Sequence, residues 1–291
     1  MRARRLLLLL GLTALLAGGP TAAGAAPPDL SGAVSLGDSY SAGEGSGPPF
    51  DVGTNVARNR CHRSPLAWPR LLGVPGDGHL ACSGARIENL TAGQSPLPPD
   101  DRGQLTRLAT TPVAPTYVLL TLGGNDAGFA DIVRQCVVGY CGPLIAAASA
   151  GLPALGVRLE DAYRDIAAAA RGGRVLVVGY PELIPERPPR GLRCIWLGDR
   201  EVPATLGFIA GLNATIADAA RRAGVEFVPT GDAFDGHELC TASSWVFPIV
   251  LNPFSINPQQ GHPRAPGQAA MAQRVRTYLE ANPVTPGAPA D

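Results

Sequence analysis

Short apolar runs alternate with helix-like segments along most of this chain, and this alternation restricts the fold more than any other feature. Five runs have the length and the apolar, partly β-branched character of buried strands: 33–36, 78–82, 116–121, 174–179 and 225–228. Helical spacing, helix formers or capping residues mark the segments 66–72, 100–109, 156–171, 202–222 and 267–279. Strands joined by helices form parallel sheets that are covered on both faces. The sequence therefore predicts a single-domain α/β protein, with three layers α/β/α around a five-stranded parallel sheet.

The ends of these strands carry polar residues that are far apart in the sequence. Handedness rules leave few topologies for such a sheet, among them the flavodoxin-like order 2-1-3-4-5, whose ligand crevice opens between strands 1 and 3. Ser39 follows the first predicted strand, Gly84 the second and Asn125 the third. We therefore expect these three residues to meet at the carboxyl edge of the sheet.

The stretch from Val34 to Glu44 ends an apolar run abruptly in Gly-Asp-Ser, before a Gly-rich polar segment. A hydroxyl on a tight turn at this edge lies where ligands bind in α/β sheets. We expect Ser39 to be a nucleophile and Asp38 to be a turn-forming structural acid. The segment 43–47 resembles a dinucleotide loop only superficially, and we predict a flexible rim there.

A serine nucleophile needs a base, and the chain has four histidines. We expect His62 and His237, each close to a cysteine, and His79, inside a predicted strand, to be structural or solvated. His262 lies in a loop just before the last predicted helix, where its side chain can reach over the edge of the sheet. It is therefore a candidate base, and the resemblance described below favours it.

Residues 1–26 have the pattern of a secretory signal peptide. Three arginines begin the segment, an apolar run of about a dozen residues follows, and small residues around Ala25 and Ala26 form a cleavage region. The run is shorter than the roughly 20 residues that a membrane-spanning helix needs. We expect cleavage near Ala25/Ala26, secretion without stable membrane insertion, a folded domain over 27–282 and a frayed Pro-rich tail over 283–291. An uncleaved anchor is the less favoured alternative.

Six cysteines, all after the predicted signal, are consistent with an oxidising compartment. Six cysteines can pair in several ways, and the sequence alone does not choose among them. No C-x-x-C motif occurs and the acidic residues are scattered, so we expect structural disulfides, no metal and no cofactor. The formal net charge is zero, with no basic run beyond the first five residues, which argues against nucleic acid as a partner.

Four segments resemble the four blocks of the SGNH (GDSL-type) hydrolases, in the right order and over essentially all of the mature chain. They are Gly37-Asp38-Ser39-Tyr40, Gly84 after Cys82-Ser83, Gly123-Gly124-Asn125-Asp126 and His262-Pro263. The cysteines narrow the resemblance to the secreted three-disulfide bacterial lipases and esterases. It implies the SGNH hydrolase fold and the sequential disulfides Cys61–Cys82, Cys136–Cys141 and Cys194–Cys240.

The resemblance also implies the activity: a serine esterase or lipase that cleaves acyl esters through an acyl-enzyme on Ser39, with His262 as general base. The backbone N–H groups of Ser39 and Gly84 and the side-chain amide of Asn125 would form the oxyanion hole. The enzyme would be a monomer with a small-molecule or lipid ester as its partner. A phospholipase or carbohydrate acetylesterase of the same fold, and a non-catalytic secreted binding protein, are the alternatives.

One position departs from the family pattern. Many members have Asp three residues before the histidine, whereas this chain has Gln259, a neutral amide that cannot stabilise imidazolium by charge. Some three-disulfide relatives use a main-chain carbonyl instead, so we predict a Ser–His dyad in which the Gln259 carbonyl orients His262. Asp232 or Asp235 acting as a distant acid is the alternative. The apolar stretch 245–254 is expected to be core or an acyl-binding wall.

Overall fold

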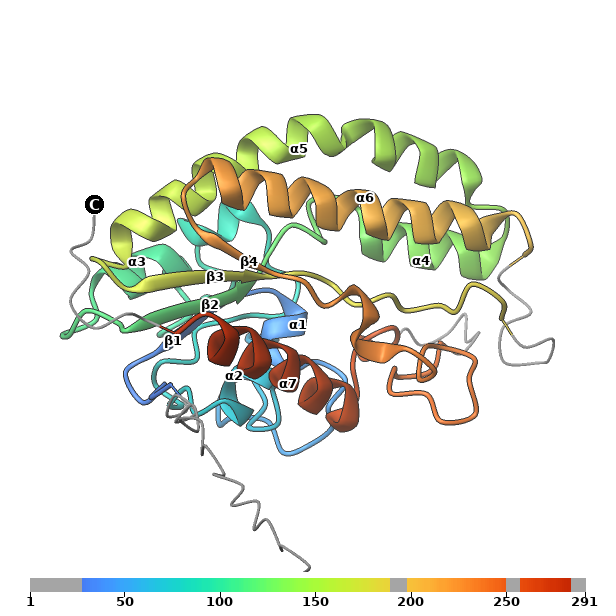
Figure 1. The fold of residues 1–291 in the computed structure, drawn as a ribbon. Coiled ribbons are helices and arrows are strands. Elements are labelled where there is room, and N and C mark those ends of the chain that lie inside the picture. The colour runs from blue at the N-terminus through green and yellow to red at the C-terminus, as the bar shows by residue number, and fades with distance from the viewer. Residues whose placement is uncertain (1–27, 189–197, 250–256, 284–291) are drawn as a thin grey trace, which may run out of the picture.

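The computed structural model describes residues 28–188, 198–249 and 257–283. A parallel sheet of four strands lies at its centre (Figure 1). The strands, in spatial order, are β1 (Val34–Gly37), β2 (Tyr117–Thr121), β3 (Arg174–Val178) and β4 (Glu226–Val228). Every residue of β1 and β2 is buried, because helices and loops cover both faces of the sheet.

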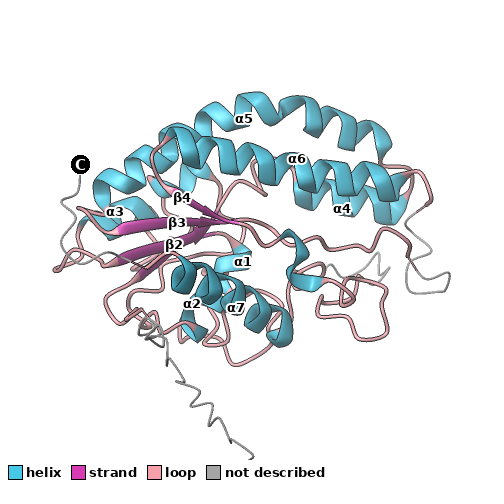
Figure 2. Ribbon diagram, in the orientation of Figure 1, coloured by secondary structure: helices cyan, strands magenta, loops and turns pink. Residues whose placement is uncertain are grey.

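Helices form a layer on each side of this sheet (Figure 2). One layer contains α3 (Gln104–Ala109), α4 (Phe129–Val138), α5 (Gly142–Ala169) and α6 (Glu201–Arg222), with α5 and α6 packed along each other. The other contains α2 (Trp68–Leu71) and α7 (Ala265–Ala281), which contact each other. The short helix α1 (Ser39–Ala42) and the 3₁₀ turns η1 (Ile87–Leu90) and η2 (Gly231–Phe234) lie in connections. The predicted α/β class with three layers is therefore confirmed.

The number of regular strands differs from the prediction, so the five-stranded order 2-1-3-4-5 is not confirmed. The segment 78–82 runs beside β1, and Leu80 N–H donates to the Ser35 carbonyl at 2.8 Å, but only one bridge forms, between Ser35 and His79. The chain then turns away from the sheet, because Cys82 is joined to Cys61 and Ser83 N–H donates to the Cys61 carbonyl. The regular sheet therefore has four strands instead of five, and these four are the first, third, fourth and fifth predicted strands in the predicted order.

The helix boundaries differ most around the second disulfide. We expected one helix over 156–171, but α5 begins at Gly142, and α4 precedes it. The Cys136–Cys141 disulfide joins the end of α4 to the residue before α5. Pro153 lies inside α5 at an exposed position, so the helix continues through a residue that usually ends one.

Candidate active site

The turn after β1 is built around Asp38. Its Oδ1 accepts hydrogen bonds from Tyr40 N–H at 3.0 Å and from the Thr121 hydroxyl at 2.7 Å, and its Oδ2 accepts one from the Tyr180 hydroxyl at 2.5 Å. Burial raises the pKa of Asp38 to about 6, although these hydrogen bonds lower it. Asp38 caps α1 and fixes the backbone on which Ser39 stands, in agreement with the predicted structural role.

Gly37 lets the strand approach its neighbour at this turn. Its φ is +110°, and a Cβ at this position would lie 2.1 Å from the Thr121 carbonyl oxygen. The Gln104 side chain accepts from Gly37 N–H at 2.7 Å and donates to the Gly37 carbonyl at 2.9 Å. The end of β1 is therefore held by a side chain from α3, immediately before the nucleophile candidate.

Ser39 and His262 form a hydrogen-bonded pair. The Nε2 atom of His262 lies 2.7 Å from the Oγ of Ser39. Tyr40, which follows Ser39 in α1, holds the histidine in place. Its ring centroid is 5.5 Å from that of His262, and its hydroxyl donates to the Gly261 carbonyl at 3.1 Å. The structure thus brings together the two residues that the sequence analysis selected as nucleophile and base.

Main-chain carbonyls of the loop before His262 lie near its other ring nitrogen, Nδ1. The Nδ1 atom of His262 lies 3.2 Å from the carbonyl oxygen of Gln260, whereas the Gln259 carbonyl accepts the backbone N–H of His262 at 3.1 Å. The Gln260 carbonyl therefore faces Nδ1, and the orienting role that we predicted for the Gln259 carbonyl stays a prediction. The tight turn 257–261 points the Gln260 carbonyl at the imidazole ring.

Burial lowers the pKa of His262 below its ordinary value of 6.5. The Glu44 carboxylate and the main-chain carbonyls of the loop before His262 raise this pKa, but they do not overcome the effect of burial. At neutral pH the imidazole is accordingly neutral, which is the form that can accept a proton from a serine hydroxyl.

Gly84 and Asn125, the other two residues expected to meet Ser39, line the same cleft, whose volume is about 1030 Å³. Gly84 is exposed to the cleft, and neither its N–H nor that of Ser39 donates to another described residue. The Asn125 side chain donates to the Ala85 carbonyl at 3.0 Å through one of its two amide hydrogens. Ser39, Gly84, Asn125 and His262 therefore border one space, as the sequence analysis predicted.

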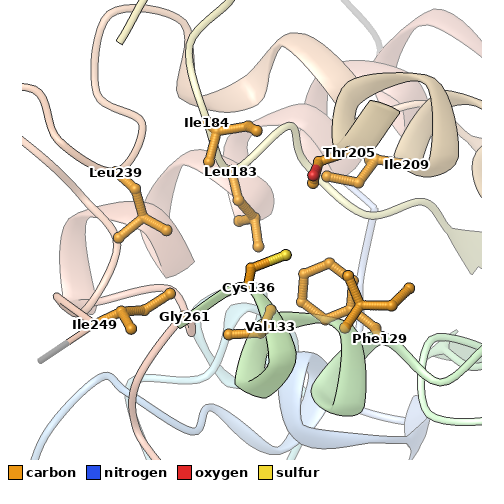
Figure 3. Close-up of a pocket in the computed structure, with 11 residues that line it drawn as sticks. Phe129, Val133, Cys136, Leu183, Ile184, Thr205, Ile209, Leu239, Ile249 and Gly261 are labelled. Carbon is orange, nitrogen blue, oxygen red and sulfur yellow. The ribbon is translucent and has the colours of Figure 1, made fainter. Parts of the chain in front are cut away.

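One part of the cleft, which we call the apolar arm, lies beside α4. It is lined by Phe129, Val133, Leu183, Ile209 and Ile249, which also line a small inner pocket (Figure 3). In the figure these side chains come from α4, α6 and two loops and point toward a common space. Ile249 belongs to the stretch predicted as core or acyl-binding wall, and residues 250–256 of that stretch lie outside the described residues.

The segment after α1 is not the flexible rim that we predicted. Glu44 is 1% exposed, and its Oε2 accepts from Nδ1 of His62 at 2.5 Å and from the Ser83 hydroxyl at 2.7 Å. Gly45 has a φ of +86°, and a Cβ there would lie 2.8 Å from the Cβ of His262. The segment is a packed wall between the serine, the histidine and the loop that carries Gly84. Sequence analysis missed Glu44, because it lies between Gly43 and Gly45 and no local pattern marks it as buried.

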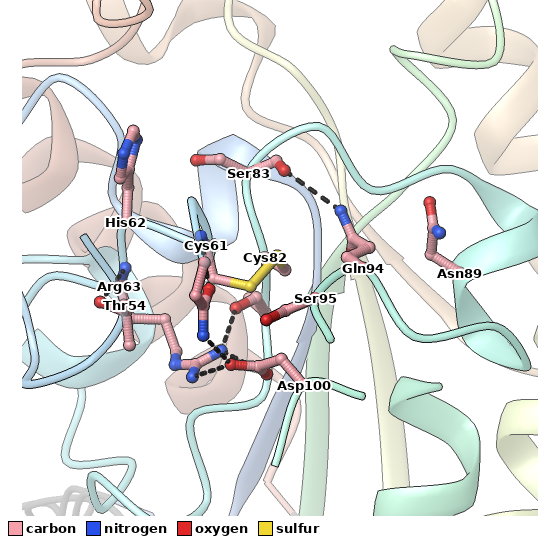
Figure 4. The surroundings of a disulfide bond; sticks show 12 residues. Thr54, Cys61, His62, Arg63, Cys82, Ser83, Asn89, Gln94, Ser95 and Asp100 are labelled. Atoms are coloured by element: carbon pink, nitrogen blue, oxygen red, sulfur yellow. Dashed lines mark hydrogen bonds and ion pairs between the residues drawn. A yellow bond between two sulfur atoms is a disulfide. The ribbon is translucent and has the colours of Figure 1, made fainter. Parts of the chain in front are cut away.

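The first disulfide anchors that loop (Figure 4). Cys61 is bonded to Cys82, and Cys136 to Cys141, as the resemblance implied. The third pairing, Cys194–Cys240, includes a residue outside the described ones and stays a prediction. Beside the first disulfide, Arg63 and Arg107 hold the buried Asp100 at 2.7 and 2.5 Å.

His79, His237 and Asp232 have partners away from the serine. His79 faces the Ser35 hydroxyl at 2.6 Å, and His237 stacks on Trp245 with ring centroids 3.7 Å apart. Asp232, one of the two alternative acids, pairs with Arg274 at 2.7 Å. Asp235 follows η2, and in the described part of the chain no hydrogen bond or ion pair joins it to His262.

Comparisons with known proteins show to which family the chain belongs. Residues 35–281 match the model of the GDSL-like Lipase/Acylhydrolase family. Lipase 1 of Streptomyces coelicolor is 34% identical over 267 residues, which cover 90% of this chain and 91% of that protein. A lipase of Streptomyces rimosus is 32% identical over 246 residues, covering 81% of this chain and 82% of that protein.

Two solved structures are similar over most of their length. Phospholipase A1 from Streptomyces albidoflavus NA297 superposes with a TM-score of 0.70 and 29% identity, covering 85% of this chain and 98% of that one. The extracellular lipase of Streptomyces rimosus superposes with a TM-score of 0.68 and 30% identity, covering 84% and 98%.

Proposed function

Because the chain belongs to the GDSL-like lipase/acylhydrolase family and is by that membership a carboxylic ester hydrolase, we propose that it is a secreted enzyme that cleaves acyl lipid esters through an acyl-enzyme on Ser39. The observation that carries this proposal is the 2.7 Å hydrogen bond between the Ser39 hydroxyl and Nε2 of His262. The extracellular lipase among the similar structures supports secretion. Loss of residues 1–26 as a signal peptide is part of the same proposal.

In this mechanism Ser39 is the nucleophile and His262 the general base. Nε2 accepts the hydroxyl proton while Oγ attacks the ester carbonyl, and the protonated imidazole then donates that proton to the departing alcohol oxygen. Water hydrolyses the acyl-serine ester by the same two proton transfers, which releases the acid. The lowered pKa of His262 supports the role of base, because the neutral ring is available at neutral pH.

The oxyanion hole comprises the backbone N–H groups of Ser39 and Gly84 and the free amide hydrogen of Asn125. The support for this assignment is that all three residues line the cleft around the Ser39 hydroxyl. Each such donor typically contributes about 2.7–4 kcal/mol to lowering the barrier. Gly84, with a φ of +79°, adopts a backbone conformation that presents its N–H at little steric cost.

The base acts as half of a dyad in this proposal. The Gln260 carbonyl, 3.2 Å from Nδ1, accepts the Nδ1–H and so keeps the lone pair of Nε2 directed at Ser39. A neutral acceptor suffices to select this tautomer. Gln259 contributes the backbone turn rather than its side chain.

The apolar arm favours a lipid acyl chain over an acetyl group on a polar carbohydrate. Its lining by aromatic and branched side chains is the environment in which methylene groups are stabilised by burial, at roughly 0.8 kcal/mol each. A phospholipid is the second candidate, since Arg60, Arg86 and Arg134 also line the cleft and one similar structure is a phospholipase A1.

Hydrolysis of p-nitrophenyl esters from C2 to C16, with a triglyceride, a phospholipid and acetylated xylan in parallel, tests the proposal. We expect turnover to increase from C2 toward medium or long chains, with little deacetylation of xylan, and no turnover by Ser39→Ala. Inactivity of the folded wild-type protein on every ester would support a binding protein instead. Highest activity on acetylated xylan would support the carbohydrate esterase.

A further inference from the structure

Glu44 is a buried carboxylate that joins three segments of the active site. It follows α1, and both its own N–H and that of Gly43 donate to the carbonyl oxygen of Ser39 at 3.0 Å. Its side chain accepts from His62, next to the first disulfide, and from Ser83, next to Gly84. A charge at 1% exposure is costly unless its hydrogen bonds repay the lost hydration, so this arrangement needs an explanation.

Both donors reach the same carboxylate oxygen, Oε2, at 2.5 and 2.7 Å. The other oxygen, Oε1, and Nε2 of His62 are both buried, and neither has a hydrogen-bond partner among the described residues. Here one oxygen collects the donors from two loops, which fixes the position of one loop relative to the other.

The hydrogen bonds continue from Ser83 to the candidate oxyanion hole. Gly84 follows Ser83 directly, and the Ala85 carbonyl accepts the hydrogen bond from the Asn125 side chain at 3.0 Å. On the far side of this loop, Ile87 N–H donates to Asp126 at 3.1 Å. Hydrogen bonds and the short segment 83–85 therefore connect the backbone of Ser39, through Glu44, to Gly84 and Asn125, which are the other two oxyanion donors.

Figure 4 shows His62 and Ser83 near the Cys61–Cys82 disulfide, each directly after one of the two cysteines in the chain. The disulfide fixes the base of the loop, but it does not fix the direction of the Gly84 N–H two residues later. The Ser83 hydroxyl bond to Glu44 supplies that restraint on one side, and the Gln94 amide, which donates to the Ser83 carbonyl at 3.2 Å, supplies it on the other.

We propose that Glu44 is a positioning residue, which holds the Gly84 N–H at the oxyanion site through the hydroxyl of Ser83. This inference rests on the proposed function, because it assigns a role within that oxyanion hole. Burial raises the pKa of Glu44, whereas the hydrogen bonds from His62 and Ser83 lower it. The net effect is a pKa below the ordinary value, so the carboxylate is ionised at neutral pH. An ionised acceptor gives shorter and stronger hydrogen bonds than a neutral one.

Three variants separate the positioning role from general destabilisation. Ser83→Ala removes the bond to the loop and leaves the carboxylate in place. Glu44→Gln can offer its amide oxygen at the place of Oε2, so it can keep both hydrogen bonds while losing the charge. Glu44→Ala removes both. The matched control is Asp100→Asn, another buried carboxylate, which is bonded to Arg63 and Arg107 and does not line the cleft.

The test is a set of kcat and KM measurements on one p-nitrophenyl ester at pH 8, each with a thermal melt. We expect Ser83→Ala and Glu44→Ala to lower kcat about tenfold or more with KM within about twofold, because the oxyanion forms only in the transition state. Glu44→Gln should lose less of kcat than Glu44→Ala, because its amide oxygen can keep both hydrogen bonds. Asp100→Asn should melt at lower temperature with kcat unchanged.

Wild-type kcat in Ser83→Ala would overturn the inference, and so would a rise in KM at constant kcat. An equal loss of kcat in Asp100→Asn would also overturn it, since general loosening would then explain the effect. If Glu44→Ala does not fold, Ser83→Ala still decides the question. Because every variant is compared with an active wild type, failure of the inference is distinct from failure of the proposed function, in which the wild type itself is inactive.

Discussion

Nε2 of His262 lies 2.7 Å from Oγ of Ser39, although 223 positions separate the two residues in the chain. Ser39 follows β1, and His262 lies in the loop before α7. The two side chains therefore meet only when α7 has packed beside the sheet. Asp38, Gly37 and Tyr40 hold the serine side of this pair, and the turn that ends at Gly261 holds the histidine side.

Asn125→Ala should lower kcat about 10²- to 10³-fold and leave KM nearly unchanged, because the side-chain amide bonds the oxyanion only as it forms. Kinetics on a p-nitrophenyl ester measure this directly. Asn282→Ala, at the end of α7 and outside the cleft, is the control and should retain wild-type kcat. A rise in KM at constant kcat would instead make Asn125 a substrate-binding residue.

The rate should be lost as the pH falls through the pKa of His262, since only the neutral ring accepts the proton. Burial lowers that pKa, so the midpoint of the acid limb of kcat/KM should lie below pH 6.5. Glu44 is the charged group that raises it, while Ser39 and Tyr40 face the ring as neutral groups. Glu44→Gln should therefore move the limb to still lower pH. A limb that moves upward in this variant contradicts the assignment.

Gln259→Ala should retain most of the activity, because the His262 ring faces the main-chain carbonyl of Gln260 and the Gln259 carbonyl serves the backbone. Asp232→Asn should be equally mild, since Asp232 pairs with Arg274. Steady-state kinetics of both variants check the dyad. A fall of about three orders of magnitude in kcat of either one would be the signature of a triad acid or an essential side chain.

The two disulfides should differ in their effect on stability. Cys61–Cys82 closes a separation of 21 residues and Cys136–Cys141 one of 5, so loop entropy predicts losses of about 3 and about 2 kcal/mol in the free energy of unfolding when each pair is replaced by alanine. Urea unfolding of the two double variants measures both values. A larger loss from the short loop would mean that lost packing around Cys136 outweighs loop entropy.

The elements that could be predicted are those with strong local signals. β2, β3, α6 and α7 each lie within two residues of the predicted bounds, because apolar periodicity and terminal Gly residues mark them. The segment 78–82 has a strand pattern, but its disulfide and its turn toward Cys61 depend on residues far away. Gly139, Pro143 and Pro153 weaken the helical pattern in the sequence of this region. In the structure only Gly139 ends a helix, α4, whereas α5 contains both prolines.

The residues of the candidate site also fall into those that could be predicted from the sequence and those that could not. Ser39, Gly84, Asn125 and His262 could be selected because their types and order match a known family and the edge of a parallel sheet collects them. Glu44 could not, because glycines on both sides suggest an exposed loop. Its burial results from His62 and Ser83, which reach it from 18 and 39 residues along the chain. Pairing of this kind has no local pattern.

Covalent labelling of Ser39 tests the central claim most directly. The folded protein would be incubated with an organophosphonate ester, and its intact mass and peptide map measured. We predict one adduct, on the peptide that contains Ser39, with no adduct in Ser39→Ala and much slower labelling in His262→Ala. An unmodified wild-type protein, or an adduct on another residue, would contradict the account.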